Sequence, residues 1–176
     1  MRSTDNPMKS PAYRNGAVAL LVAIGALATA FAFEKIGGYV PCPLCLMQRY
    51  AYFAGIPLTF VALILLAGGH RTAAIGLMFL VSLAYLAKAG LGTYHAGAEW
   101  KFWPGPDTCG AAGQPVTKSA ADLLKGLETT RVIRCDEAPW RFLGLSFAGW
   151  NVVISLLLWI TLQQAAFGAA AEKNKN

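Results

Sequence analysis

The sequence predicts an all-α membrane protein, a bundle of four transmembrane helices with one short and one long cysteine-bearing loop. Of its 176 residues, 56% are hydrophobic and only 14% are charged, and the mean hydropathy is +0.46. A soluble domain usually carries about 25% charged residues. Four mostly apolar runs approach the roughly 20 residues that a helix needs to cross a bilayer. The four cysteines all lie outside these runs.

Composition also excludes other classes of protein. Intrinsic disorder requires low hydrophobicity together with high charge, so this apolar chain does not fit that class. Fifteen Lys and Arg residues against nine Asp and Glu residues give a net charge of +6. The basic residues are scattered and are interrupted by long apolar runs, which is not the pattern of a nucleic-acid-binding surface. We therefore expect a lipid bilayer, and no nucleic acid, as a partner.

The first predicted span is uncharged and longer than the apolar region of a typical signal peptide. Glu34-Lys35-Ile36 follows it, which is not a small-residue cleavage site, so we expect a retained helix. The third run reaches a spanning length only if it continues past Lys88, whose side chain is expected to extend to the membrane surface. The predicted spans cover residues 16–33, 46–67, 72–92 and 144–162 and together form one transmembrane domain, 16–162.

An even number of spans places both termini on one side of the membrane. The tails 1–15 and 163–176 are short and rich in Lys and Arg, which favours a cytoplasmic location for them under the positive-inside rule. The loops 34–45 and 93–143 then share the opposite side. All four cysteines are in these two loops, so they face the same compartment.

The motif Cys42-Pro43-Leu44-Cys45 immediately precedes the second apolar run. Pro43 suits the first position of a helix, which makes Cys42 the expected N-cap. The positive end of a helix favours a thiolate over a thiol. Arg49 lies one turn beyond Cys45 on the same predicted helix face, and a nearby cation lowers the pKa of a thiol. The sequence therefore predicts a reactive cysteine pair at the membrane boundary, with Cys45 as a thiolate.

The second pair, Cys109 and Cys135, lies in the long loop. Three interpretations of the four cysteines are open: structural disulfides, a structural zinc site, and a redox relay. A structural disulfide has little use for a CxxC motif, and only one cysteine pair has the close spacing typical of zinc sites. A relay would pass two electrons from the exposed pair to the membrane-boundary pair. Because the sequence has no dinucleotide-binding or haem-attachment motif, a membrane quinone is the remaining common acceptor.

At these residues the chain resembles the disulfide bond formation protein B family, DsbB. The resemblance runs from the first span to the fourth. It is carried by four segments, 41–49 (PCPLCLMQR), 94–100 (YHAGAEW), 103–109 (WPGPDTC) and 135–145 (CDEAPWRFLGL). It implies a bacterial inner-membrane protein-dithiol:quinone oxidoreductase with periplasmic cysteine loops. Such an enzyme reoxidises a periplasmic DsbA-like thioredoxin-fold oxidase, reduces ubiquinone or menaquinone, and thereby sustains disulfide bond formation.

The resemblance also implies a role for individual residues. Cys109 forms the mixed disulfide with the partner oxidase, and Cys135, released by that attack, exchanges with Cys42. Cys45 then faces the quinone as a thiolate in a charge-transfer contact assisted by Arg49. His95 lies near a family position associated with the quinone pocket. We expect no metal ion to take part.

Two alternative functions are weighed against this interpretation. The first is a vitamin K epoxide reductase-like thiol oxidoreductase, which is also a helical bundle with a CxxC motif. That family places the motif near the end of its last helix, whereas here the motif opens the second span. The second alternative is a non-enzymatic membrane scaffold held together by structural disulfides. The relay requires a crevice next to Cys42 and Cys45 that admits a quinone headgroup.

Overall fold

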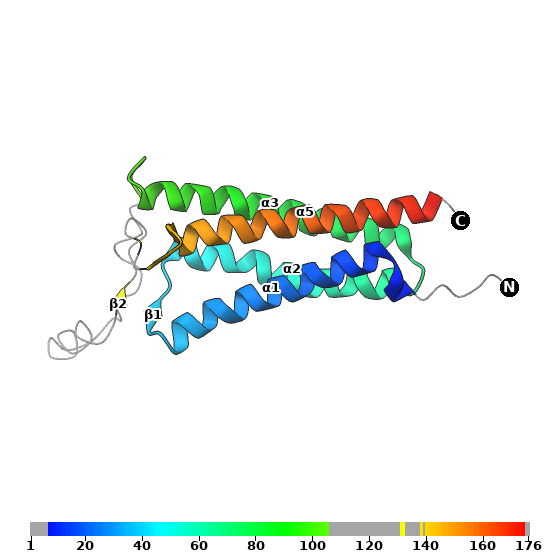
Figure 1. Ribbon diagram of the computed structural model, residues 1–176, viewed down its shortest axis with the longest axis horizontal. Helices are drawn as coiled ribbons and strands as arrows, with labels where there is room; N and C mark the ends of the chain where they lie inside the picture. Colours follow the sequence, from blue (N-terminus) through cyan, green and yellow to red (C-terminus); the bar gives the residue numbers. More distant parts are fainter. Residues whose placement is uncertain (1–6, 106–130, 133–137, 139, 175–176) are drawn as a thin grey trace.

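The computed structural model describes residues 7–105, 131–132, 138 and 140–174, and four long helices make up most of this part of the chain. Figure 1 shows them lying lengthwise beside one another. A single 3-10 turn, Pro7–Lys9, precedes them. The helices are α1 (Pro11–Lys35), α2 (Pro43–Ala67), α3 (Arg71–Glu99) and α5 (Phe147–Asn174).

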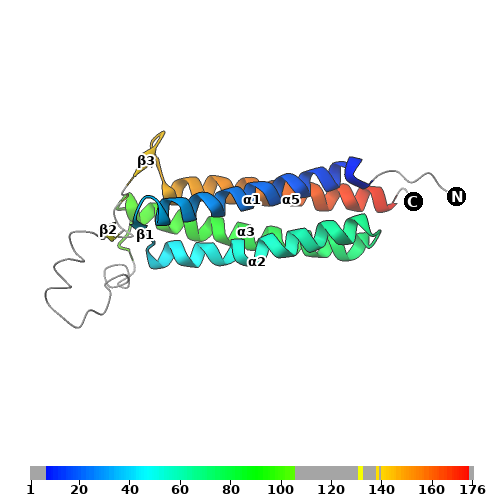
Figure 2. The ribbon, with the colours of Figure 1, turned by 90° about the horizontal axis from the view of Figure 1, so that it is seen from below.

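The four helices form a ring in which α1 packs against α2 and α5, and α3 packs against α2 and α5. Figure 2 shows the same neighbours from a second direction. The start of α1 and the end of α5 lie at the end of the bundle where α2 connects to α3, and the short strands lie at the opposite end. Each helix is long and apolar enough to cross a membrane. The predicted fold class, a four-helix transmembrane bundle, is confirmed.

The helices extend beyond the apolar runs from which the spans were predicted. At the start of α1, the Ser10 side chain accepts a hydrogen bond from the Tyr13 backbone N–H, and Pro11 occupies the first turn. These are the residues that favour a helix start. The α2–α3 connection is short, with Gly69 at a φ of +82° that a residue without a Cβ adopts at little cost. The last helix is an exception at its start, because it begins at Phe147, three residues after the predicted start of the fourth span at 144, where Leu145–Ser146 form a strand instead. It continues to Asn174, beyond the predicted end at 162.

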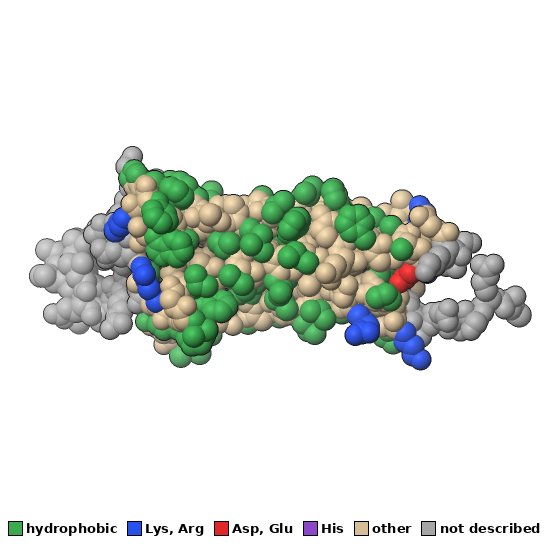
Figure 3. Space-filling view, turned by 45° about the horizontal axis from the view of Figure 1, so that its top comes forward, with side chains coloured by type: hydrophobic (Ala, Val, Ile, Leu, Met, Phe, Trp, Pro, Cys, Tyr) green, Lys and Arg blue, Asp and Glu red, His purple; other side chains and the backbone are tan. Residues whose placement is uncertain are grey.

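Small side chains allow the helices to approach closely. Most of the alanines facing the bundle interior have almost no exposed surface, among them Ala12, Ala19, Ala62, Ala74 and Ala165. Larger residues, such as Met78, Tyr85 and Leu158, fill the remaining space. This mixture is typical of membrane bundles, where close packing takes the place of the hydrophobic effect. Figure 3 shows hydrophobic side chains along the flank of the bundle, with Lys and Arg gathered near its two ends.

Lys88 corrects one prediction, because its side chain does not extend to the membrane surface. It is 4% exposed, and its Nζ lies 2.6 Å from Asn151 Oδ1 and 3.2 Å from Ser155 Oγ, both on α5. The physical reason is its helix face. Lys88 lies on the side of α3 that packs against α5, where hydrogen-bond acceptors are available inside the bundle.

Four two-residue strands lie at the cysteine end of the bundle. The first, β1 (Tyr39–Val40), pairs in parallel with β2 (Arg131–Val132), so that Tyr39 faces Arg131 and Val40 faces Val132. The other two, β3 (Arg141–Phe142) and β4 (Leu145–Ser146), form an antiparallel hairpin. Leu143 and Gly144 connect β3 to β4 with φ values of 52° and 83°, the positive pair that a tight hairpin turn requires. The hairpin leads directly into α5.

We predict that Gly55→Ala destabilises the bundle. A Cβ at Gly55 would lie 2.5 Å from the Oη atom of Tyr85, a side chain that is 1% exposed and has no room to move away. Overpacking of this kind costs about 1–3 kcal/mol, so the thermal unfolding midpoint in detergent should fall. Gly76→Ala is the matched control, because nothing lies within 4 Å of a Cβ added there. An equal midpoint for the two variants would contradict the packing described here.

Candidate functional site

The N-terminus of α2 carries the first cysteine pair. Cys42 is the N-cap residue, and its Sγ accepts a hydrogen bond from the backbone N–H of Cys45 at 3.2 Å. Pro43 occupies the first helical position, so the predicted N-cap is confirmed. The Cys42 sulfur therefore lies at the positive end of the helix dipole.

The two sulfur atoms of the motif lie next to each other. Both cysteines are free thiols, and their Sγ atoms are 2.8 Å apart. Cys42 is 1% exposed, whereas Cys45 is half-buried. Residues one helical turn apart satisfy the Cα spacing of a disulfide. The pair can therefore form an S–S bond by giving up two electrons and two protons, with little movement of the backbone.

His95 of α3 approaches the same sulfur from the neighbouring helix. Its side chain is 2% exposed, and its Nε2 lies 3.8 Å from Cys42 Sγ and 3.8 Å from Glu99 Oε1. Glu99, one turn further along α3, accepts a hydrogen bond from the Ser146 hydroxyl of β4. The Cys42 thiol and the Glu99 carboxyl therefore lie at the same distance from one imidazole nitrogen of His95.

The surroundings of Cys42 favour its thiolate. The hydrogen bond from Cys45 is the largest influence, and burial opposes it. The interaction with His95 and the backbone N–H of Cys45 act in the same direction as the first. Together they lower the pKa of the Cys42 thiol from its ordinary value to about 5. The structure thus differs from the prediction, which assigned the thiolate to Cys45, because the N-cap position and His95 both serve Cys42.

Arg49 lies on α2 facing α1, where it pairs with Glu34. Its Nη1 donates a hydrogen bond to Glu34 Oε2, and its guanidinium carbon lies 5.0 Å from the centre of the Phe31 ring. The side chains of Arg49 and Glu34 are 12% and 22% exposed. Arg49 was predicted to lie beside Cys45, and its ion pair with Glu34 was not predicted. The charge of Arg49 is thus shared with a carboxylate at the end of α1.

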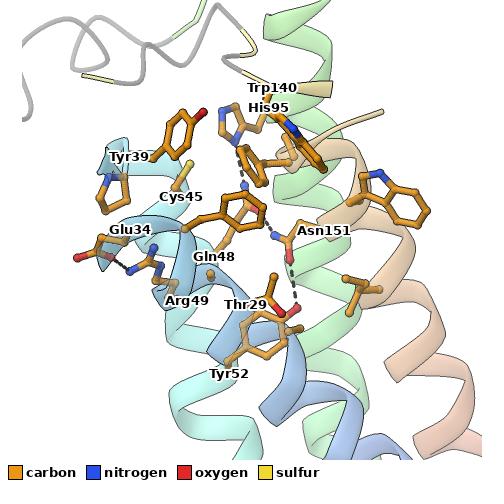
Figure 4. Close-up of a pocket in the computed structure, with 18 of the residues that line it drawn as sticks. Thr29, Glu34, Tyr39, Cys45, Gln48, Arg49, Tyr52, His95, Trp140 and Asn151 are labelled. Carbon is orange, nitrogen blue, oxygen red and sulfur yellow. Dashed lines mark hydrogen bonds and ion pairs between the residues drawn. The ribbon is translucent and has the colours of Figure 1, made fainter. Parts of the chain in front are cut away.

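A cavity of about 490 Å³ opens beside these groups. Figure 4 shows side chains from the four helices and from the segment before α5 converging on it, with Cys45 and Arg49 on the α2 side. Most of the wall is apolar and aromatic. Phe33, Trp140 and Phe147 form a cluster there, with Phe147 4.8 Å from Phe33 and 5.0 Å from Trp140 between ring centroids. The polar part of the wall consists of Thr29, Glu34, Cys45, Gln48, Arg49, Tyr52, His95, Glu99 and Asn151.

The structure brings together four of the six residues predicted for the site. Cys45, Arg49 and His95 line the cavity, and Cys42 lies directly behind Cys45. The other two, Cys109 and Cys135, lie outside the described residues. The crevice that the relay requires is therefore present beside the CxxC motif.

Six polar residues of the cavity wall were not predicted: Thr29, Glu34, Gln48, Tyr52, Glu99 and Asn151. Gln48 lies three residues after Cys45, and its Nε2 is 3.2 Å from His95 Nδ1. Glu99 lies four residues after His95, and Glu34 ends the first apolar run. The available signal was spacing, because Gln48 and Glu99 each fall one helical turn from a residue already singled out. Glu34 gave no such signal, since its partner is on another helix.

The same cluster meets the distance requirement for binding a metal ion. The ligand atoms of Cys42, Cys45 and His95 all lie within 4.8 Å of one another. Two thiolates and one imidazole are a donor set that zinc accepts. The absence of a metal from the reaction therefore stays a prediction.

Comparison with known proteins assigns the family. Residues 14–164 match the family model for disulfide bond formation protein DsbB. A disulfide bond formation protein B of Marinobacter nauticus is 33% identical over 78% of this chain and 82% of its own length. One from Aromatoleum aromaticum is 32% identical over 78% of this chain and 81% of its own, and one from Albidiferax ferrireducens is 29% identical over 81% and 80%.

No solved structure matches the chain significantly. The match to the family model covers α2 and α3 completely, with the CxxC motif that precedes α2, and it covers most of α1 and the first part of α5. This removes the vitamin K epoxide reductase-like interpretation. The chain belongs to the DsbB family of disulfide bond formation proteins, and it is a multi-pass membrane protein.

Proposed function

We propose that the protein is a protein-dithiol:quinone oxidoreductase of the bacterial inner membrane. It reoxidises a periplasmic DsbA-like thiol oxidase and passes the electrons to ubiquinone or menaquinone. Membership of the family accounts for the disulfide chemistry. The single observation that supports electron transfer to a quinone is the position of Cys45. Its sulfur lies 2.8 Å from the sulfur of Cys42 on one side, and on the other side it lines a mostly apolar cavity.

The cavity suits a quinone headgroup in size and chemistry. Its volume of about 490 Å³ lies within the roughly 300–1,000 Å³ of small-molecule sites. A quinone ring is flat and apolar on its faces, which matches the cluster of Phe33, Trp140 and Phe147. Its two carbonyl oxygens accept hydrogen bonds, and Arg49 and Gln48 on the cavity wall have donors to offer.

The proposed electron path conserves atoms and charge at each step. The partner's dithiol becomes a disulfide as the Cys109–Cys135 disulfide becomes a dithiol. That dithiol then reduces the Cys42–Cys45 disulfide and is itself reoxidised. Finally the Cys42–Cys45 dithiol forms its S–S bond, and its two electrons and two protons convert the quinone to a quinol. No metal ion is needed in this sequence.

The β1–β2 pairing supports communication between the two cysteine pairs. Val40, two residues before Cys42, pairs with Val132, three residues before Cys135. The segments that lead to these two cysteines therefore run side by side in the same direction. Such an arrangement favours thiol exchange between Cys135 and Cys42, which the relay requires.

The proposed orientation follows from the arrangement of the bundle. The strands and the CxxC motif lie at one end, and the chain termini lie at the other. With the Lys- and Arg-rich tails in the cytoplasm, the cysteine end faces the periplasm. There it meets the partner oxidase, while the cavity stays within reach of lipid-soluble quinone.

We expect prereduced protein in lipid vesicles to regain the Cys42–Cys45 disulfide when quinone is added. The reason is that Cys45 borders the cavity proposed for the acceptor. Free thiols would be titrated before and after quinone addition, with oxygen excluded, and quinol formation would be followed by absorbance. Cys45→Ser serves as the negative control. Failure to regain any disulfide while quinone is present in excess would overturn the proposal.

We expect Arg49→Ala to slow quinone-dependent reoxidation by about tenfold or more, the effect of losing a charged group placed at a reacting centre. Exchange between the partner and Cys109–Cys135 should be largely unaffected. Lys35→Ala is the matched control, because Lys35 is the other cation near Glu34, at 3.6 Å, and its side chain is 75% exposed. Equal loss of both half-reactions in Arg49→Ala would instead indicate misfolding.

We expect the Cys42 thiol to titrate far below its ordinary range. In a reduced Cys109→Ser, Cys135→Ser variant without quinone, thiolate absorbance should appear as the pH rises through about 5. The sign follows from the lowered pKa, since the thiolate form exists above that pH and is protonated below it. His95→Gln should move the midpoint upward, because it removes one of the interactions that favour the thiolate. A midpoint in the ordinary thiol range would show that Cys42 is not activated.

A further inference from the structure

Lys88 is a lysine buried inside the transmembrane bundle. It is 4% exposed and donates to Asn151 Oδ1 and Ser155 Oγ, and its Nζ lies 3.4 Å from the centre of the Tyr52 ring. Among the described residues, none of the ion pairs includes Lys88. An ionisable group inside a membrane is costly and usually functional. The electron path proposed above gives Lys88 no role.

The contacts of Lys88 define the direction of its hydrogen bonds. The Ser155 hydroxyl uses its proton on the backbone oxygen of Asn151, at 2.5 Å, so its Oγ can only accept from Lys88. Two oxygen atoms and the π face of the Tyr52 ring surround Nζ, and this geometry favours the protonated form of Lys88. An ammonium group has donors and no acceptor. The atom of the Asn151 amide that faces Lys88 must therefore be the oxygen, and the NH₂ group must point the other way.

From Asn151 the hydrogen bonds continue to the redox centre. The Asn151 Nδ2 donates to Gln48 Oε1, and the Gln48 Nε2 lies 3.2 Å from His95 Nδ1. Figure 4 shows these two bonds as dashed lines joining His95, Gln48 and Asn151. Each amide accepts with its oxygen on one side and donates with its nitrogen on the other. The direction of the hydrogen bond at Lys88 therefore also fixes the direction of the bonds from Asn151 to Gln48 and from Gln48 to His95.

The last link determines which nitrogen of His95 carries the proton. Since Gln48 donates to it, Nδ1 has to be an acceptor, and a neutral imidazole then carries its proton on Nε2. Nε2 is the atom that lies 3.8 Å from Cys42 Sγ. With the opposite polarity, the Asn151 NH₂ group would face the Lys88 ammonium at 2.6 Å, donor against donor. A buried ammonium therefore selects one of two otherwise equivalent arrangements.

We propose that Lys88 is a positioning residue, which acts through Asn151 and Gln48 to hold His95 in the tautomer that presents an N–H to Cys42. The proposal rests on the redox role assigned to Cys42 in the proposed function. The N–H of His95 then stabilises the Cys42 thiolate in the reduced enzyme. The other ionisable groups facing this nitrogen and this sulfur are Cys45 of α2 and Glu99 of α3, and Arg141 of β3 acts electrostatically on Glu99.

Two variants test the direction of the hydrogen bonds. Lys88→Met removes the ammonium donor and keeps an unbranched side chain. The Tyr52 hydroxyl, 3.2 Å from Asn151 Oδ1, remains and can either donate or accept, so both polarities become available and His95 should populate both tautomers. Asn151→Asp keeps an acceptor for Lys88, but the new carboxylate cannot donate a hydrogen bond to Gln48. Gln48 must then donate to Asp at this position and turn its oxygen toward His95, which moves the imidazole proton to Nδ1. Ser82→Ala is the control, because it removes a buried hydroxyl from α3 outside this set of contacts.

The measurement is ¹⁵N NMR of the histidine side chains in the reduced full-length protein without quinone or partner. The chain has two histidines, so His70 serves as an internal reference. We expect the Nε2–H form in the wild type and in Ser82→Ala, a mixture in Lys88→Met, and the Nδ1–H form in Asn151→Asp. In Asn151→Asp the thiolate-to-thiol ratio of Cys42 at fixed pH should fall by about tenfold, the size of a one-unit pKa change. In Lys88→Met, where part of the Nε2–H form remains, the ratio should fall by less.

Retention of the Nε2–H form in both test variants would overturn the proposal. Where Lys88→Met does not fold, Lys88→Gln takes its place, because its amide can both donate and accept and so also makes both polarities available. Asn151→Asp tests the link from Asn151 through Gln48 to His95. The result is independent of the proposed function, because no quinone is present. A changed tautomer in a protein that cannot use quinone would refute the proposed function only, and an unchanged tautomer in a quinone-active protein would refute this inference only.

Discussion

Inside a bilayer, a polar group has no water to bond with, so it has to find its partners within the protein. This constraint organises the whole bundle. The backbone groups satisfy it by forming four long helices, and the buried side chains satisfy it by bonding across helix boundaries. Lys88 reaches Asn151 and Ser155, and Arg49 reaches Glu34, each on a different helix. The positions of the polar side chains therefore decide how the helices are placed around the cavity.

The Cys42–Cys45 pair lies at a helix end, where this constraint is relaxed. At the start of α2 the first backbone N–H groups lack partners within the helix, and the sulfur of Cys42 accepts one of them. The partial positive charge of the helix N-terminus favours a thiolate at that sulfur, and the contacts with Cys45 and His95 favour it further. One residue thus completes the helix end and supplies the electron-rich atom. The cavity beside it is bordered by Cys45, so the two cysteines divide the work between an enclosed sulfur and an accessible one.

The charges around the site are arranged in two separate groups. Arg49 and Glu34 neutralise each other between α1 and α2, while His95, Glu99 and the cysteines lie between α2 and α3. Gln48 and Asn151 connect the second group to Lys88 in the membrane interior. Hydrogen bonds therefore connect the sulfur atoms at the cysteine end with the middle of the bundle.

The sequence by itself determined the four helices and their antiparallel order, because hydrophobic length and an even number of spans leave little freedom. The shared side of the four cysteines stays a prediction, since Cys109 and Cys135 lie outside the described residues. It also determined the N-cap role of Cys42, since Pro-containing helix starts depend on neighbouring residues alone. Only the tertiary structure decided which side chains meet across helices. Lys88 was expected at the surface and Arg49 beside Cys45, yet their partners are Asn151 and Glu34. Those contacts depend on the rotation of each helix about its axis, which weakly amphipathic helices do not encode in their sequence pattern.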